Sequence, residues 1–294
     1  IRRMDSTNLE EVTRTICKYK PEYIYDFAGW SKPSESKDDP KGAELITVRS
    51  LENLFIAISK AQIYDNTYKP KQIVIATSVA AFGPGRIDQN GRPLSLNENS
   101  GWRPNSEYGM LKATATDMAI EFGQKYGVNV IAAIQANAGG SSEYFGISQR
   151  KGFIVPDNIE RVINITKGKA EEFNERGEPV LKTGPADQFI NMTSVDQMVE
   201  AYIRLGKIET REKVIVGASN SVQVKQIIKW IIDASGMKID HQYPEADIAN
   251  QYYDTTRLKN TIGFVPAPIN EADIAKAVSW HRQKIQTEII DKIV

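Results

Sequence analysis

Short runs of β-branched residues alternate with longer amphipathic stretches over the first two thirds of the chain. Strands are predicted over residues 23–29, 71–77, 128–135 and 214–217, and helices over residues 45–60 and 108–126. Consecutive parallel strands need long crossover connections, which are usually helices, so this alternation is typical of a parallel sheet covered by helices. The chain is therefore predicted to have an α/β fold with a doubly wound parallel sheet.

Charge and cysteine content exclude several classes of function. The 294 residues include 37 Lys and Arg against 37 Asp and Glu, a balance that gives no sign of binding to nucleic acid or to an anionic membrane surface. No apolar run is long enough to span a bilayer. Cys17 is the only cysteine, so no internal disulfide can form, and a reducing, cytoplasmic location is expected. The sequence has two histidines and this single cysteine, which are too few ligands for a typical zinc site, so no metal site is predicted.

One pair of residues points to proton transfer. Tyr108 and Lys112 are four apart in a predicted helix and so share one face, where the ammonium would favour the phenolate and lower the pKa of the phenol. Ser78 ends a predicted strand and could bind the same substrate oxygen. We therefore predict Ser78, Tyr108 and Lys112 as catalytic residues at a carbinol carbon. The plainer alternatives are a solvated helix pair and a serine that bonds its own backbone.

Several short segments follow one another in an order that resembles a known family. They are Met4-Asp5-Ser6, Phe27-Ala28-Gly29, Asp39-Pro40, Ser78 to Gly83, Tyr108 to Lys112, Asn137, and Gly263 to Pro266. The chain is similar in these segments to the extended short-chain dehydrogenase/reductase superfamily, in its NAD-dependent epimerase/dehydratase family. The resemblance covers nearly the whole chain.

The resemblance implies a Rossmann-type fold that binds NAD or NADP. The cofactor-binding residues that it implies are Asp5, Phe27, Ala28, Gly29, Tyr108, Lys112 and Asn137. Asp5 would accept a hydrogen bond from the adenine amino group, and Lys112 would bind the ribose. From the residues alone, Asp5 is equally suited to cap the following helix, and Asn137 to occupy a turn.

The expected domains follow from the same comparison. Residues 1–137, with a returning part around 187–217, would form the dinucleotide-binding domain. Residues 138–186 and 218–294 would form a smaller C-terminal α/β lobe that binds the substrate. Two polar stretches, 139–153 and 168–186, are expected to fold over the carboxyl ends of the strands, where open α/β sheets bind ligands.

The start of the chain departs from the family. The family opens with a strand, a Gly-x-x-Gly-x-x-Gly turn and a helix, and the sequence begins without them. These glycines let the backbone approach a pyrophosphate. We therefore expect the sequence to be N-terminally incomplete. The choice between NAD and NADP usually depends on this segment and stays open.

Two further departures bear on reaction and substrate. Ala80 stands where dehydratases of the family carry the acid that protonates the leaving hydroxyl, so a dehydratase is disfavoured against an epimerase or keto-reductase. Arginines that hold the diphosphate of nucleotide sugars are replaced by neutral side chains near Gln188 and Gln251. A nucleotide sugar remains the expected substrate. The basic residues expected to replace them are Arg150, Lys151, Lys182 and Arg257.

Two questions of assembly stay open at this stage. The family commonly dimerises through helices that match residues 45–60 and 108–126, so a homodimer is expected, although burial within one chain would give the same apolar pattern. The alternative function is a non-catalytic, cofactor-binding or scaffold subunit of a larger assembly. The intact Ser78, Tyr108 and Lys112 set favours the enzyme.

Overall fold

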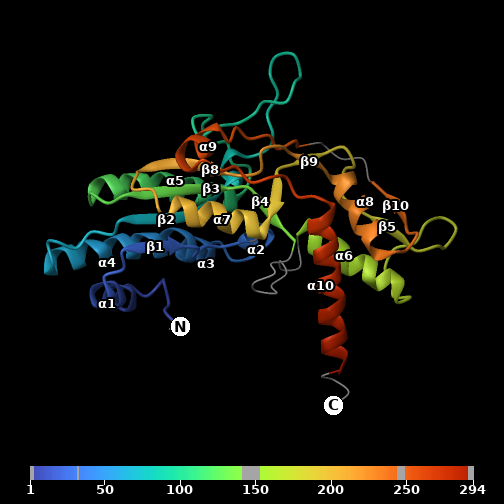
Figure 1. The fold of residues 1–294 in the computed structure, drawn as a ribbon, viewed down its shortest axis with the longest axis horizontal. Helices are drawn as coiled ribbons and strands as arrows, with labels where there is room; N and C mark the ends of the chain where they lie inside the picture. The colour runs from blue at the N-terminus through green and yellow to red at the C-terminus, as the bar shows by residue number, and fades with distance from the viewer. Residues whose placement is uncertain (1–2, 32, 141–152, 244–248, 291–294) are drawn as a thin grey trace.

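The fold is built around a parallel sheet. The computed structural model describes residues 3–31, 33–140, 153–243 and 249–290. Its main sheet has four parallel strands in the order β1-β2-β3-β8 (Figure 1). These strands are β1 (Tyr23–Asp26), β2 (Gln72–Ser78), β3 (Val130–Gln135) and β8 (Glu212–Val216). The predicted parallel α/β sheet is confirmed, with strand ends that differ from the predictions by up to three residues.

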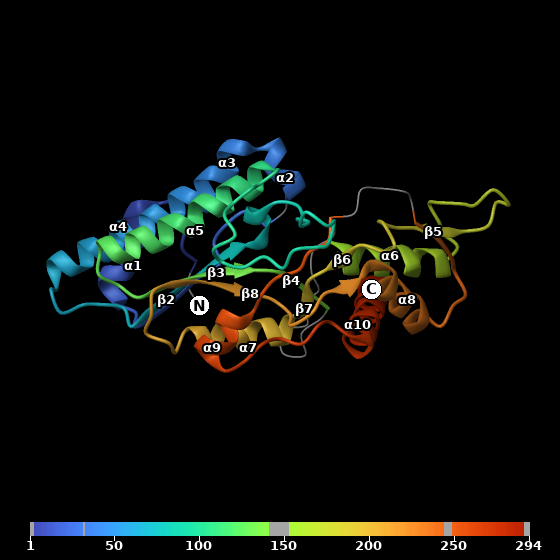
Figure 2. The same cartoon turned by 90° about the horizontal axis from the view of Figure 1, so that it is seen from above.

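Helices cover both faces of this sheet (Figure 2). On one face lie α1 (Leu9–Tyr19), α4 (Ser50–Tyr64) and α5 (Glu107–Lys125), and on the other lie α7 (Val195–Leu205) and α9 (Thr256–Ile262). Alternate residues of β2 point to opposite faces, so Ile73 and Ile75 pack with the first group and Val74 with the second. The sheet is therefore doubly wound, as predicted.

The helix predicted over residues 45–60 is longer and not uniform. It starts with α3 (Pro40–Glu44), where the Asp39 side chain accepts a hydrogen bond from the Gly42 N–H, and continues through a π-helical segment (Leu45–Arg49) into α4. The apolar face of α4, including Phe55 and Ile58, is fully buried inside the chain. That face is therefore no evidence for a dimer.

A second group of elements forms a lobe at one end of the sheet (Figures 1 and 2). Its helices are α6 (Ile154–Thr166), α8 (Val224–Ser235) and α10 (Glu271–Ile290), which share an apolar core that includes Ile159 and Ile227. The short strands pair as β4 (Asn137–Gly139) with β7 (Met192–Ser194), β5 (Val180–Lys182) with β10 (Asp240–Gln242), and β6 (Phe189–Ile190) with β9 (Val222–Gln223). The helix α9 lies outside this lobe, because Leu258 packs against the main sheet.

Of the two stretches predicted to fold over the strand ends, 139–153 and 168–186, the structure describes mainly the second. Most of residues 139–153 lies outside the described residues. In the stretch 168–186, β5 belongs to the outer part of the lobe, and Gly184 is the residue of this stretch that lines the large cleft at the strand ends. Within the described ranges, no helix has the length and apolar character needed to cross a membrane.

Candidate active site

A cleft of about 590 Å³ opens at the carboxyl ends of the main strands, between the sheet and the lobe. Side chains from both parts line it. From the sheet side come Phe27, Gly29, Ser78, Tyr108, Lys112 and Gln135, and from the lobe side come Asn137, Gln188, Ile190, Met192, Val224 and Gln251. The structure therefore brings Ser78 together with Tyr108 and Lys112, which lie in a later segment of the chain.

Close packing of α5 against the end of β2 brings Ser78 and Tyr108 together. The Ser78 hydroxyl accepts a hydrogen bond from the Ala80 N–H at 3.2 Å, at the start of a short 3₁₀ helix (Val79–Phe82). A side chain at Gly109 could not fit, because its Cβ would lie 2.6 Å from the Ala80 carbonyl oxygen. Glycine at 109 thus lets the first turn of α5 approach the strand end, where Tyr108 and Ser78 are hydrogen-bonded.

Lys112 lies one turn further along α5 and is 6% exposed. Its Nζ is 5.7 Å from the centroid of the Tyr108 ring. On the other side the ammonium rests against the turn that follows β1, since a Cβ at Gly29 would be 2.8 Å from Nζ. A Cβ at position 29 would push the flexible end of Lys112 aside, and the φ of +156° at Gly29 is one that L side chains rarely adopt, so glycine suits this turn.

Burial controls the ionisation of both groups. It lowers the pKa of Lys112 to about 8, against the attraction of the Asp26 carboxylate, which raises it. Burial raises the pKa of Tyr108, and the hydrogen bond with Ser78 opposes that rise. The predicted fall in the phenol pKa is therefore not found in this structure, because desolvation outweighs any effect of the ammonium.

A family comparison identifies the group of proteins to which this arrangement belongs. The sequence model described as GDP-mannose 4,6 dehydratase matches residues 1–289. The chain belongs to this family. The family is part of the NAD-dependent epimerase/dehydratase superfamily, so the resemblance seen in the sequence motifs is confirmed.

Solved structures of other proteins share the architecture described above. RMD from Pseudomonas aeruginosa, complexed with NADPH, superposes with a TM-score of 0.78 at 17% identity, covering 96% of this chain and 88% of that one. UDP-glucose 4-epimerase from Thermotoga maritima, with UDP-glucose, gives 0.76 at 18% identity over 97% and 84%. The Thermus thermophilus UDP-glucose 4-epimerase complex with NAD gives 0.73 at 19% over 95% and 84%. These likenesses establish the Rossmann-type fold.

The amide of Asn137 in this GDP-mannose 4,6 dehydratase family member is held inside the cleft. Its Nδ2 donates to the Asn191 carbonyl and to the Gln251 Oε1, both at 2.9 Å. Because both N–H groups of Nδ2 are bonded inside the protein, the side-chain oxygen Oδ1 is the amide atom of Asn137 that could contact a cofactor. Gln135 is also fixed, because its Oε1 accepts from the hydroxyl of the buried Tyr202 at 2.9 Å.

Asp5 is not among the residues that line the cleft. Its carboxylate accepts from the Thr7 N–H at 2.9 Å and from the Thr7 hydroxyl at 2.7 Å, and these bonds lower its pKa. The sequence alternative that Asp5 caps the first helix is wrong. Asn8 is the N-cap of α1, because it is one turn closer and its side chain accepts from the N–H groups of Glu10 and Glu11.

Sequence reasoning missed Asp26, the last residue of β1. Its Oδ1 accepts a hydrogen bond from the Ala28 N–H at 2.8 Å. Ala28 is predicted from the sequence to bind the cofactor, but it is not among the residues that line the cleft. The one available signal was an acidic residue directly before Phe27-Ala28-Gly29.

Of the four basic residues expected to replace the family arginines, the two that the structure describes, Lys182 and Arg257, do not line the cleft. Arg257 pairs with the buried Glu98 at 3.5 Å and donates to the Lys213 carbonyl. Lys182 is exposed on β5. Arg150 and Lys151 lie outside the described residues.

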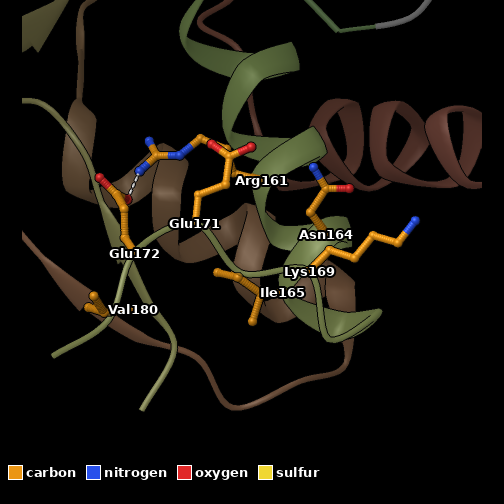
Figure 3. Close-up of a pocket in the computed structure, with 7 residues that line it drawn as sticks. All are labelled: Arg161, Asn164, Ile165, Lys169, Glu171, Glu172 and Val180. Carbon is orange, nitrogen blue, oxygen red and sulfur yellow. Dashed lines mark hydrogen bonds and ion pairs between the residues drawn. The ribbon is translucent and has the colours of Figure 1, made fainter. Parts of the chain in front are cut away.

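A second hollow, in the lobe, offers no comparable site. Figure 3 shows that it lies between α6 and the segment before β5, with Arg161 paired to Glu172. Its free volume is about 10 Å³, room for about one water molecule. Among the described residues, no cluster of His, Cys, Asp or Glu could hold a metal ion.

Proposed function

We propose that this protein is an NAD(P)-dependent epimerase or keto-reductase that acts at a carbinol carbon of a nucleotide sugar. The observation that carries the proposal is the meeting of Ser78, Tyr108 and Lys112 in one cleft. Support for the substrate and the cofactor comes from relatives of the same fold, whose structures contain UDP-glucose, NAD or NADPH.

The cleft fits a nicotinamide cofactor in its chemistry. Lys112 lines the cleft with a buried ammonium that can donate to ribose hydroxyls, and the bare backbone at Gly29 permits close approach. Phe27, Ala28 and Asn137 would hold the same ligand near the strand ends, and Asp5 would receive its adenine. When bound, the nicotinamide would supply or accept the hydride.

Tyr108 would be the proton-transfer group. As a phenolate it would take the proton of the substrate hydroxyl, and as a phenol it would return a proton to the keto oxygen. Its raised pKa suits the second step, whereas the first needs a cation at the phenol oxygen, which Lys112 would provide. Ser78 would hydrogen-bond the substrate oxygen and so hold it at Tyr108.

A dehydratase remains disfavoured despite the family's description. Loss of water needs an acid at the leaving hydroxyl. Of the cleft-lining residues in the described part of the chain, none has a carboxylate side chain, and Val79 lines the wall beside Ser78. We also propose that the sheet binds the cofactor and the lobe the sugar. Homodimerisation and a cytoplasmic location stay predictions.

Turnover with defined substrates tests the proposal. Purified protein is given UDP-glucose or GDP-mannose with NAD or NADP, and products are followed by NMR while reduced cofactor is followed by absorbance. An epimerase gives the epimer without net change in cofactor. In a second assay with a 4-keto sugar nucleotide and NADH or NADPH, a reductase consumes the reduced cofactor. A product that has lost water would overturn the exclusion of dehydration.

The scaffold alternative has its own signature. Denaturing the protein and identifying released nucleotide by mass spectrometry shows whether NAD(H) or NADP(H) is carried. No released nucleotide, no thermal shift with added dinucleotide and no turnover would together favour a non-catalytic subunit over the enzyme.

A further inference from the structure

Asp26 ends β1, at the turn against which the Lys112 ammonium lies. The Asp26 carboxylate is fixed there by the Ala28 N–H, which donates to Oδ1 at 2.8 Å. Two residues later, the position of a Cβ at Gly29 would be 2.8 Å from the Lys112 Nζ. One short turn therefore orients the carboxylate and forms the wall against which the ammonium lies.

The carboxylate is costly to keep at this position. Burial raises the pKa of Asp26, while the Ala28 N–H and the Lys112 charge both oppose that rise. A partly buried acid destabilises a fold unless a cation and hydrogen bonds compensate it. The Ala28 hydrogen bond alone does not explain an acid, because the amide oxygen of asparagine would accept it as well.

The other titratable groups around Lys112 are phenols. Tyr108 shares α5 with the lysine. Burial raises the pKa of Tyr202, from α7, which lies close enough to Tyr108 for the phenol of Tyr108 to contribute to that rise. The charged side chains that the structure describes on α2 (Pro33–Asp38), α3 and the π-helical segment, which pack against α5, are exposed. Asp26 is thus the carboxylate that interacts with the Lys112 ammonium within the described residues.

We propose that Asp26 is a positioning residue that keeps the Lys112 ammonium protonated and in place beside Tyr108. This role rests on the proposed function, in which Lys112 stabilises the Tyr108 phenolate. Asp26 acts through the lysine and has no assigned contact with substrate. The attraction offsets part of the desolvation that favours neutral Lys112.

The test separates the charge of Asp26 from its hydrogen bond. The full chain is labelled with ¹³C-lysine, the Lys112 signal is assigned by its loss in Lys112→Met, and its titration is followed by NMR. In Asp26→Asn, which keeps an acceptor for Ala28, we expect the pKa of Lys112 to fall below its wild-type value of about 8. The alkaline limb of kcat/KM should move to lower pH by the same amount.

Matched variants keep the test decisive. Asp65→Asn is the control, because Asp65 also accepts an N–H two residues ahead, from Thr67, and binds a lysine, Lys20, at 2.6 Å. It should leave the Lys112 titration unchanged. Asp26→Ser, which also offers an acceptor without charge, replaces Asp26→Asn if that variant does not fold.

The outcomes separate this proposal from the proposed function. An unchanged Lys112 titration in the Asp26 variants would reduce Asp26 to a turn residue and overturn the proposal. A shifted titration in a protein that turns over no sugar nucleotide would retain the Asp26–Lys112 coupling and refute the proposed enzyme.

Discussion

The two walls of the cleft differ in the chemistry of their side chains. On the sheet side, the Tyr108 phenol and the buried Lys112 ammonium line the cleft, and the Asp26 carboxylate at the end of β1 attracts the ammonium. On the lobe side, the described lining residues are apolar or carry neutral amides, such as Gln188 and Gln251. The core behind the lobe wall consists of aliphatic side chains.

The difference suggests that the sheet wall carries out the reaction and that the lobe wall stabilises the fold. Buried ionisable groups cost stability and are kept where a reaction needs a shifted pKa. A core of interdigitating Ile and Val lowers the free energy of the fold and does no chemistry. The sheet wall should therefore respond to mutation mainly in rate, and the lobe wall mainly in stability.

The largest effect is expected for Tyr108→Phe on the sheet side. Removing the phenol oxygen removes the proton acceptor, so kcat should fall by about 10²–10⁴-fold. Steady-state assays on the substrate found for the wild type measure it. Tyr64→Phe, at a position 82% exposed, is the matched control and should be neutral. Full turnover by Tyr108→Phe would remove Tyr108 from the mechanism.

Ile159→Ala should show the reverse behaviour in the lobe. Ile159 has no exposed surface in the apolar core, so the truncation should lower the free energy of unfolding by about 2–5 kcal/mol. Chemical denaturation measures this loss, and kcat of the folded fraction should be retained. The same change at Ile63, which is 78% exposed, should cost less than about 0.5 kcal/mol. A fall in kcat without loss of stability would contradict the comparison.

Lys112→Met should change both catalytic rate and stability on the sheet side. The fall in the lysine pKa from its ordinary 10.5 to about 8 corresponds to about 3 kcal/mol, at about 1.4 kcal/mol for each pKa unit. Methionine removes that cost, so the variant should be more stable at neutral pH by up to this amount, and inactive. Urea denaturation and turnover measure the two effects.

The pH dependence of stability gives an independent check on Lys112. Between about pH 8 and the ordinary pKa of 10.5, the unfolded chain binds a proton that the native lysine has lost. Stability of the wild type should therefore rise with pH over this window relative to Lys112→Met. Equal pH dependence in the two proteins would mean that Lys112 titrates normally. The exposed Lys60→Met should behave as the wild type.

The parts that sequence could predict are those with local signals. The strands around residues 71–77 and 128–135 follow from apolar runs, and the pairing of Tyr108 with Lys112 follows from helix spacing. The order of the family motifs then indicates that Ser78 lies beside them. These predictions need no knowledge of which distant segments pack together.

Contacts made by tertiary packing could not be predicted in the same way. The Asp26 carboxylate acts on Lys112 because the turn after β1 lies against the Lys112 side chain, and Arg257 pairs with Glu98, which is distant in sequence. The pKa of Tyr108 depends on how completely α5 is buried, which residue spacing does not determine. Asn8 rather than Asp5 caps α1 because the helix begins at Leu9, and helix ends are weakly specified by sequence.

The smallest expected effect concerns the amides of the lobe wall. In Gln251→Leu, the Asn137 Nδ2 keeps its bond to the Asn191 carbonyl and loses its bond to Oε1, which should cost about 1–3 kcal/mol of stability. Gln251→Glu keeps an acceptor oxygen at the same distance along the side chain, so it should recover most of that loss. Thermal denaturation of the two variants compares them directly. Equal losses in both would show that the hydrogen bond does not hold Asn137, and would leave the lobe wall supported by its apolar side chains alone.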